Sequence, residues 1–429
     1  MLRGASIVCL SSIDWPFNRQ NPQEASLAFA ERGNRVFFIE NTGVRNVSLR
    51  DGGRLWSRLL QWCRARGRVR SVAPGIDVLS PVLLPFPYSR MAVHLNARIL
   101  LRSLRTWLGE SSGPVVVLTF LPTPLAHEAI AALDPALVIY YCIDRFTESS
   151  PGARRVVHSE RKLLAEADLV LVTSDVLCQM AAEVSPNVHV IVSGVRAKEF
   201  ECARLSRAAP HAAFSGLSGP IVGFVGSLRS STDLALLSSV AALAPELQFV
   251  VAGPRFVDVT MLASQPNIRL LEAIPHEDVM NFMVRFDIGI LPYAIDEFTA
   301  AIMPVKLKEY LAAGLPVVAT PLPEVRLFAE RHPGLVRFAE NAPAFVAALR
   351  AAVSDTAPEA VQRRLAAAGQ YEWSAQTAQI IELVEQALVG TQMSRAFQSP
   401  VRPSGAAIGI TAAHSGNDAS SRRPRRLSR

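Results

Sequence analysis

The sequence contains no apolar run that approaches the roughly 20 residues needed to span a bilayer, so we expect no transmembrane helix. Residues 6–12, SIVCLSS, are too few and too soon followed by Asp14 for a secretory signal, and we interpret them as a buried strand. The cysteines are scattered, odd in number and without metal-ligand spacing, which excludes a disulfide scaffold or a structural zinc site. They are Cys9, Cys63, Cys142, Cys178 and Cys202. A cytoplasmic protein without a bound metal is therefore expected.

Three common nucleotide and hydrolase motifs are also missing. The segment after the first predicted strand, SIDWPFNRQNPQ, has no glycine, and VGFVGS supplies only Gly223 and Gly226, so a dinucleotide-binding fingerprint is absent. Neither a P-loop nor a G-x-S-x-G elbow occurs. These absences exclude the usual NAD-dependent, P-loop and serine-hydrolase classes.

Acidic residues are outnumbered, with 37 Asp and Glu against 44 Lys and Arg, which gives a net charge of +7. Most of this excess lies in residues 394–429, which hold seven arginines and one acid, Asp418. Because the rest of the chain is nearly neutral, a nucleic-acid-binding protein remains only a third hypothesis. This tail is rich in Ser, Gly, Ala and Pro and is predicted to be disordered, as a solvated end or as a weak contact with anionic lipid.

Apolar strand-like segments alternate with helical ones through two successive halves of the chain. The strand candidates are SIVCLSS, RVFFIEN, IDVLSP, VVVLTF, LVIYYCID, DLVLVTS and VHVIVSG, then PIVGFVGS, LQFVVAG, IRLLEAI, DIGILPY, PVVAT and LVRFAE. This alternation predicts an α/β protein with two facing Rossmann-like domains and a cleft between them. Ligands of such sheets bind beyond the carboxyl ends of the strands, so the cleft is the expected site.

Composition changes give the expected domain boundaries. We assign residues 1–206 to an N-terminal Rossmann-like domain, 207–220 to a linker, 221–390 to a C-terminal Rossmann-like domain and 394–429 to the basic tail. The last helix, predicted near 373–389, is expected to pack back on the first domain.

Residues 304–320, PVKLKEYLAAGLPVVAT, place charges in an otherwise apolar unit. Pro304 suits the first helical turn and Gly314 the left-handed position after a helix, which predicts a helix over 304–313 followed by a buried strand. Lys306 and Glu309 are three residues apart and share a face near the helix N-terminus. Lys308 points elsewhere and is expected at the surface.

These segments together resemble a known family. VGS, DLALL, a strand that ends in AGP, and PVKLKEYLAAGLPVVAT resemble the retaining nucleotide-sugar-dependent glycosyltransferases of the GT-B fold, family 4, of the bacterial polysaccharide and teichuronic-acid type. The similarity runs over most of residues 5–390 and is strongest in 220–322. It implies a hexosyltransferase of polysaccharide biosynthesis that uses a nucleotide-diphosphate sugar, a saccharide or lipid-linked saccharide acceptor, and no cofactor.

The family has two glutamates, separated by seven residues, that flank the donor sugar. Glu309 matches the second, which meets the ribose hydroxyls, whereas the first falls at Ala301 and is missing. Lys306 is the expected clamp for the diphosphate, because it is cationic and shares the face of Glu309 at a helix N-terminus. The alternative is an ordinary ion pair on a solvated helix face.

A second donor element is expected in the loop after PIVGFVG. Gly226 allows the backbone to approach phosphates, Ser227 can donate to them, and Arg229 stands near the position of a basic residue in the family. Tyr293 and Thr299 are candidates for sugar or phosphate contacts. Arg229 as a solvent-facing charge and Tyr293 as a packed aromatic are the alternatives.

The acceptor side is expected in the first domain. Asp14 and Trp15 follow the first strand, where Trp15 could stack on a sugar or simply pack as an aromatic, and Asp144 follows LVIYYCI. Asp144, Asp14 and Lys306 are the catalytic candidates, with Asp144 as an acid or base near the acceptor hydroxyl. His127 and His158 are reserve candidates.

Residues 54–70 carry six arginines interleaved with Leu and Trp, a composition typical of an interfacial membrane helix or of a surface helix with an apolar stripe. The first alternative would place the enzyme on the inner face of the plasma membrane.

Two other functions stay open: a noncatalytic nucleotide-sugar or glycan-binding partner of the same fold, which the missing glutamate favours, and a nucleotide-sugar epimerase, which needs acids and histidines that converge in the cleft.

Overall fold

The computed structural model describes residues 2–16, 19–42, 69–84, 86–109, 112–145, 153–206 and 211–398. Two sequence-based assignments, the arginine-rich segment up to residue 68 and the tail from residue 399, lie outside these ranges. Within them, no helix combines the length and apolarity that crossing a membrane requires.

The first sheet has the strand order β3-β4-β2-β1-β5-β6-β7-β8. Its neighbours pair in parallel except β3 with β4, which are antiparallel. The strands are β1 (Ser6–Leu10), β2 (Arg35–Ile39), β3 (Val69–Ala73), β4 (Ile76–Leu79), β5 (Val115–Thr119), β6 (Leu137–Cys142), β7 (Leu169–Val172) and β8 (Val188–Val190). The helices between them are α1 (Asn21–Glu31), α3 (Arg90–Leu108), α4 (Pro124–Leu133), η3 (Ala153–Val156), α5 (Val157–Glu166) and α6 (Asp175–Ala182). The central strands are buried on both faces, as their continuous apolar runs predict.

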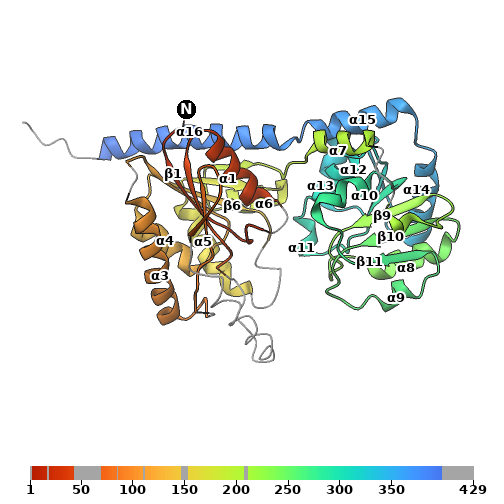
Figure 1. Ribbon diagram of the computed structural model, residues 1–429, viewed down its shortest axis with the longest axis horizontal. Helices are drawn as coiled ribbons and strands as arrows, with labels where there is room; N and C mark the ends of the chain where they lie inside the picture. The colour runs from red at the N-terminus through yellow and green to blue at the C-terminus, as the bar shows by residue number, and fades with distance from the viewer. Residues whose placement is uncertain are drawn as a thin grey trace, which may run out of the picture.

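The second sheet is entirely parallel, in the order β11-β10-β9-β12-β13-β14. Its strands are β9 (Ile221–Val225), β10 (Gln248–Ala252), β11 (Ile268–Leu271), β12 (Ile288–Leu291), β13 (Val317–Ala319) and β14 (Val336–Phe338). The accompanying helices are α7 (Ala197–Leu205), η4 (Ala212–Phe214), α8 (Leu234–Leu243), α9 (Thr260–Ala263), η5 (His276–Asp278), α10 (Val279–Met283), α11 (Glu297–Ala300), α12 (Val305–Ala312), α13 (Pro323–Arg331), α14 (Ala342–Val353) and α15 (Pro358–Gly369). The prediction of an α/β protein with two Rossmann-like domains is confirmed (Figure 1).

The chain crosses between the two domains twice, and the two crossovers pair with each other. The Val195 amide donates to the Tyr371 carbonyl at 2.8 Å, and the Trp373 amide donates to the Val195 carbonyl at 3.2 Å. After the first crossover α7, which the sequence-based boundaries assign to the first domain, packs against α10, α12 and α15 of the second. The two crossovers therefore form one short double connection.

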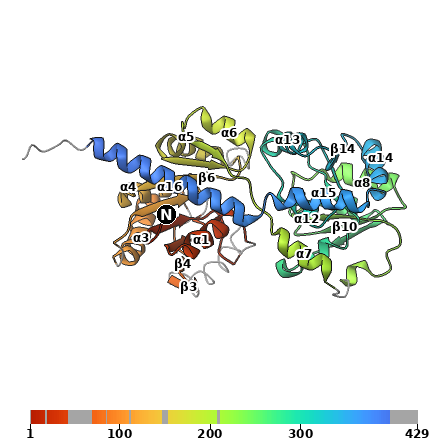
Figure 2. The ribbon, with the colours of Figure 1, turned by 90° about the horizontal axis from the view of Figure 1, so that it is seen from above.

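After the second crossover, α16 (Trp373–Gln398) returns to the first domain, as predicted. Figure 2 shows this helix running across the first sheet and its helices. Its apolar side chains join the core beneath α1, and α1 and α16 are in contact. These core residues are Ile380, Ile381, Val384 and Leu388. The first domain is thus completed by residues that follow the whole second domain.

Candidate functional site

The segment 304–320 folds as its sequence predicts, because Pro304 precedes α12 and Gly314, with φ +80°, ends it. On this helix the Lys306 ammonium donates to the Glu309 carboxylate at 2.6 Å. Both side chains are largely but not fully buried, at 25% and 21% exposed. The pair is therefore partly accessible and partly shielded from water, and charge interactions in such a place are stronger than on an open surface.

Side chains from both domains converge beside this pair. Burial raises the pKa of Tyr293 to about 12, and the carboxylates of Glu309 and Asp144 add to that effect. Asp144 follows β6 of the first domain, whereas Tyr293 follows β12 and Glu309 belongs to α12 of the second. Three of the sequence-based candidates from the two domains are thus close enough to influence one another, and Asp144 and Tyr293 follow the carboxyl ends of β6 and β12, where a ligand is expected.

Asp144 has an environment suited to proton transfer. Burial raises the pKa of its carboxyl group to about 6. The next residue, Arg145, reaches the second domain and donates to the Glu297 carbonyl at 3.4 Å. A carboxylic acid whose pKa lies this near neutrality can take up or release a proton during a reaction.

Sequence reasoning missed a basic group, Arg196, which contacts His276; the charges of Lys306 and Glu309 also act on His276. Arg196, in the first crossover, donates to His276 Nε2 at 3.3 Å and forms a close ion pair with Glu24 of α1. Burial lowers the pKa of His276, and the positive charge of Arg196 adds to that effect. The available signal was a basic residue two positions after the strand segment VHVIVSG, at the point where the chain leaves the first sheet.

The loop after β9 is held close to the neighbouring strand. The Gly226 amide donates to the Ala252 carbonyl at 2.9 Å and so continues the sheet. Gly253 has φ +149°, and a side chain there would meet the Gly226 carbonyl oxygen at 2.0 Å. Ser227 is half-buried, while Arg229 is exposed and stacks over Phe256, 4.0 Å from the ring centroid. The glycines here permit two backbone segments to approach each other.

Thr299 and Ala301 are buried next to the site but serve the local structure. The Thr299 hydroxyl donates to the Ala294 carbonyl at 2.7 Å, and its amide donates to Asp296, which caps α11. Ala301 is 2% exposed and belongs to an apolar cluster whose other buried members come from β6, β7, α5 and α6 of the first domain. The position of the missing glutamate therefore contacts the first domain through a methyl group.

Of the residues predicted for the acceptor side, Trp15 packs edge-on against Phe38, with ring centroids 5.0 Å apart, and its amide donates to Glu40 at 3.1 Å. Asp14 is half-buried beside it, and its carbonyl accepts from Gln23 at 3.3 Å. Of the reserve histidines, His127 contacts the Ser159 carbonyl at 2.9 Å, between α4 and α5.

The predicted surface position of Lys308 is wrong. Its side chain is 1% exposed, its ammonium donates to the Ser193 carbonyl, and it lies 5.2 Å from the centre of the Tyr371 ring. Burial lowers its pKa to about 7, opposed by the nearby charge of Glu309. The reason is that this face of α12 meets the paired crossovers, which lie far away in sequence.

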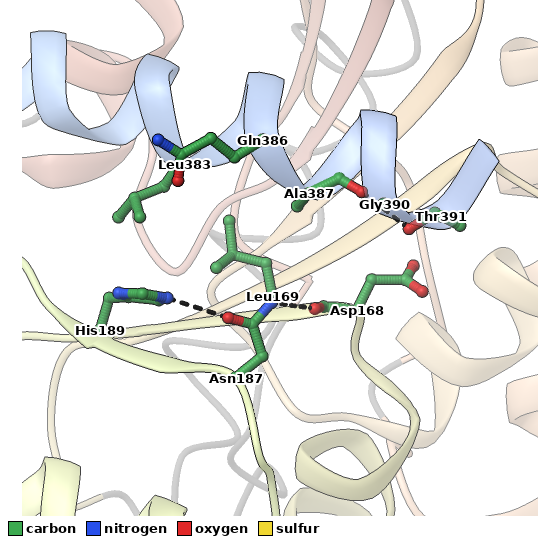
Figure 3. Close-up of a pocket in the computed structure, with 9 residues that line it drawn as sticks. All are labelled: Asp168, Leu169, Asn187, His189, Leu383, Gln386, Ala387, Gly390 and Thr391. Atoms are coloured by element: carbon green, nitrogen blue, oxygen red, sulfur yellow. Dashed lines mark hydrogen bonds between the residues drawn. The ribbon is translucent and has the colours of Figure 1, made fainter. Parts of the chain in front are cut away.

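A separate hollow of about 410 Å³ lies between α16 and the β7–β8 edge of the first sheet (Figure 3). Asp168 and Asn187 in its wall directly precede β7 and β8, so it lies at the amino ends of the strands. It is therefore at the opposite edge of the sheet from the converging charges. No group of three or more metal-ligating side chains occurs in the described part of the chain.

Comparisons with known proteins agree with this architecture. The family model described as "Glycosyl transferases group 1" matches residues 219–355. The putative teichuronic acid biosynthesis glycosyltransferase TuaH of Bacillus subtilis is 27% identical over 204 residues, which is 43% of this chain and 51% of the relative. The chain thus matches about half the length of that curated relative.

Solved structures resemble nearly the whole chain at low sequence identity. Sucrose-phosphate synthase from Thermosynechococcus elongatus has a TM-score of 0.67 at 15% identity, over 90% of this chain and all of that one. Anabaena Alr3699/HepE in complex with UDP-glucose has a TM-score of 0.60 at 14% identity, over 89% and 99%. Trehalose 6-phosphate synthase from Burkholderia multivorans gives 0.62 at 15%, over 92% and 100%. These similarities confirm the GT-B fold.

Proposed function

With a glycosyl transferases group 1 domain in residues 219–355 as the premise, we propose that the protein transfers a sugar from a nucleotide-diphosphate sugar to a saccharide or lipid-linked saccharide, with retention of anomeric configuration. The observation that carries the proposal is the convergence of Asp144 from the first domain with Tyr293 and the Lys306–Glu309 pair from the second. A UDP-glucose complex of the similar protein HepE supports a nucleotide-sugar donor.

The second domain holds the donor in this proposal. Glu309 accepts hydrogen bonds from the ribose hydroxyls, while Lys306 contacts the diphosphate. When the bond between the sugar and the diphosphate breaks, negative charge grows on the departing oxygen. A fixed ammonium group stabilises that charge more than it stabilises the bound donor, which accelerates the step.

The first domain supplies the acceptor side. The acceptor hydroxyl forms the new bond to the anomeric carbon on the face that the diphosphate leaves, so the configuration is retained. Its proton passes to the Asp144 carboxylate, which suits this task because its pKa is about 6. The role of the described residues is thus positioning, charge stabilisation and proton transfer.

One observation favours a second candidate, a noncatalytic binding partner of the same fold. Ala301 stands where the family has a glutamate, and its methyl group is buried in an apolar cluster of the first domain. A protein that lost this carboxylate could bind the nucleotide sugar without transferring it. An epimerase has no comparable support from the described residues.

A screen of nucleotide-diphosphate sugars with the purified full chain tests the proposal, by following nucleoside diphosphate release with and without a panel of saccharide and lipid-linked acceptors. We expect one donor to give acceptor-dependent release, and the product linkage, determined by NMR, to keep the donor's anomeric configuration. Donor binding without release over the whole panel would support the noncatalytic candidate instead. An inverted linkage would reject retention while leaving transfer intact.

A further inference from the structure

The outward face of α3 exposes large apolar side chains in a line. Met91, Leu95 and Ile99 are 82%, 44% and 41% exposed, and their spacing of four residues places them along one side of the helix. The inward face is already satisfied, because Ala97, Leu100 and Leu104 are buried in the core. The exposed stripe is therefore not needed to hold the helix on the domain.

Exposed arginines accompany this stripe. Arg98, Arg102 and Arg105 share the outward face of α3, and Arg90 begins the helix. The sequence of α3, RMAVHLNARILLRSLRTWL, has four arginines and no acidic residue. The neighbouring α4 contributes one acid, Glu128. The surface thus combines apolar side chains with an excess of positive charge.

The segment before α3 extends the same surface. Leu84 and Phe86 are 41% and 57% exposed, and Arg155 lies over the Tyr88 ring at 6.0 Å. We define the docking surface as Leu84, Phe86, Met91, Leu95, Ile99, Arg98, Arg102 and Arg105. Figure 1 and Figure 2 both place α3 on the side of the first domain away from the second domain.

The direction of α3 relates this surface to the cleft. The helix connects the parallel strands β4 and β5, on either side of β2 and β1, and so runs antiparallel to them. Its first turn, which carries Met91, therefore lies toward the carboxyl edge of the sheet, the edge at which Asp144 also lies.

We propose that the docking surface binds an anionic lipid bilayer. Apolar side chains that enter the acyl boundary, next to guanidinium groups that pair with lipid phosphates, are the combination that holds a helix at a membrane interface. A protein partner needs no such excess of one charge, whereas an anionic bilayer matches it. The binding itself does not rest on the proposed function; the consequence that a lipid-linked acceptor is presented to the cleft edge does.

The test is sedimentation of the full chain with vesicles of phosphatidylcholine alone or mixed with phosphatidylglycerol, without donor or acceptor. One variant replaces the apolar stripe (Met91→Ser, Leu95→Ser, Ile99→Ser) and another the arginines (Arg98→Gln, Arg102→Gln, Arg105→Gln). Two matched control variants make the same kinds of change, three apolar residues to Ser and three Arg to Gln, at exposed positions outside α3. They are Leu205→Ser, Leu243→Ser and Met261→Ser, and Arg326→Gln, Arg350→Gln and Arg363→Gln.

We expect the wild type and both controls to bind the anionic vesicles, and each α3 variant to bind about tenfold or more weakly. Thermal unfolding should stay unchanged, because all the replaced side chains are exposed. Equal binding by wild type and α3 variants would overturn the inference and assign membrane contact to other segments. If light scattering showed that the wild type is a dimer and that both α3 variants are monomers, the docking surface would bind a second copy of the chain rather than a bilayer, and the inference would be overturned. Unchanged release of nucleotide by the variants with water-soluble acceptors would separate this result from a failure of the proposed function.

Discussion

Lys306 and Lys308 stand two residues apart on α12, yet their surroundings are opposite. Lys306 is partly exposed and pairs with Glu309 at 2.6 Å, whereas Lys308 is buried against the paired crossovers with the Ser193 carbonyl and the Tyr371 ring as its partners. A rotation of about 200° along a helix separates the two faces. One short helix therefore joins the candidate donor site to the connection between the domains.

This difference shows that a charged residue in an apolar segment can serve either to bind a ligand or to hold buried structure together. Each member of a partly exposed ion pair can turn from its partner to a ligand, because a pair that still contacts water is held together only weakly. A fully buried ammonium instead shifts its pKa toward the neutral form. The comparison predicts loss of activity at one position and a pH-dependent change in stability at the other.

The largest expected effect is on Lys306. Lys306→Ala should lower the rate of nucleotide release by about 10²- to 10³-fold, the usual result of removing one group that stabilises transition-state charge. The free energy of unfolding should change by no more than about 1 kcal/mol, because the pair is partly exposed. The matched control is Lys162→Ala, which breaks the exposed Lys162–Glu166 pair, 3.8 Å apart on α5, and should leave the rate unchanged. Equal rates for both variants would remove Lys306 from the site.

The next largest effect is expected for Asp144→Asn, which should lower the rate of nucleotide release by about 10²-fold. Its carboxyl group is protonated below its pKa of about 6, so a base function is lost as the pH falls through that value. The wild-type rate should fall about tenfold per pH unit below pH 6, and Asp144→Asn should be slow at every pH without this limb. A pH profile of nucleotide release checks this. An acid limb that survives in Asp144→Asn at a near wild-type rate would assign the base to another group.

Lys308 should instead affect stability. Its folded pKa is about 7 and its ordinary value 10.5, so between these values the unfolded chain binds more protons and stability rises with pH. Relative to Lys308→Met, wild-type stability should rise by about 1.4 kcal/mol between pH 8 and pH 9. Urea unfolding of both proteins at several pH values measures the difference. A constant difference over this range would show that Lys308 keeps an ordinary pKa.

The smallest effect is expected where the domains touch away from α12. Arg331 of α13 pairs with Asp175 of α6 at 2.6 Å, but its side chain is half-exposed. Arg331→Gln should lower the free energy of unfolding by less than about 1 kcal/mol and leave nucleotide release unchanged. Urea unfolding and the release assay check both. A larger loss of stability would mean that the interdomain contact depends on this edge as much as on the crossovers.

Local patterns predicted much of the fold and part of the site. The alternation of apolar strands and helices predicts both parallel sheets, and Pro304 and Gly314 predict the bounds of α12 to within two residues. The shared face of Lys306 and Glu309 follows from helical spacing alone. These features depend on residues close together in the sequence.

Features that depend on distant segments could not be predicted. The burial of Lys308 requires Ser193 and Tyr371, which reach it from the two crossovers. The contact of Arg196 with His276 likewise joins residues of different elements, and nothing in the sequence around either residue indicates that they meet. Single-sequence periodicity reports which face of a helix is apolar but not which remote segment covers it.

The return of α16 to the first domain delays the folding of that domain during protein synthesis. The first sheet leaves the ribosome early, but part of its core is formed by side chains as late as Leu388. Domains otherwise fold in turn as they emerge, the amino-terminal one first. Here the amino-terminal half must wait, with an apolar face uncovered, until the other half has been made, and the nascent chain is most in need of a chaperone during that interval.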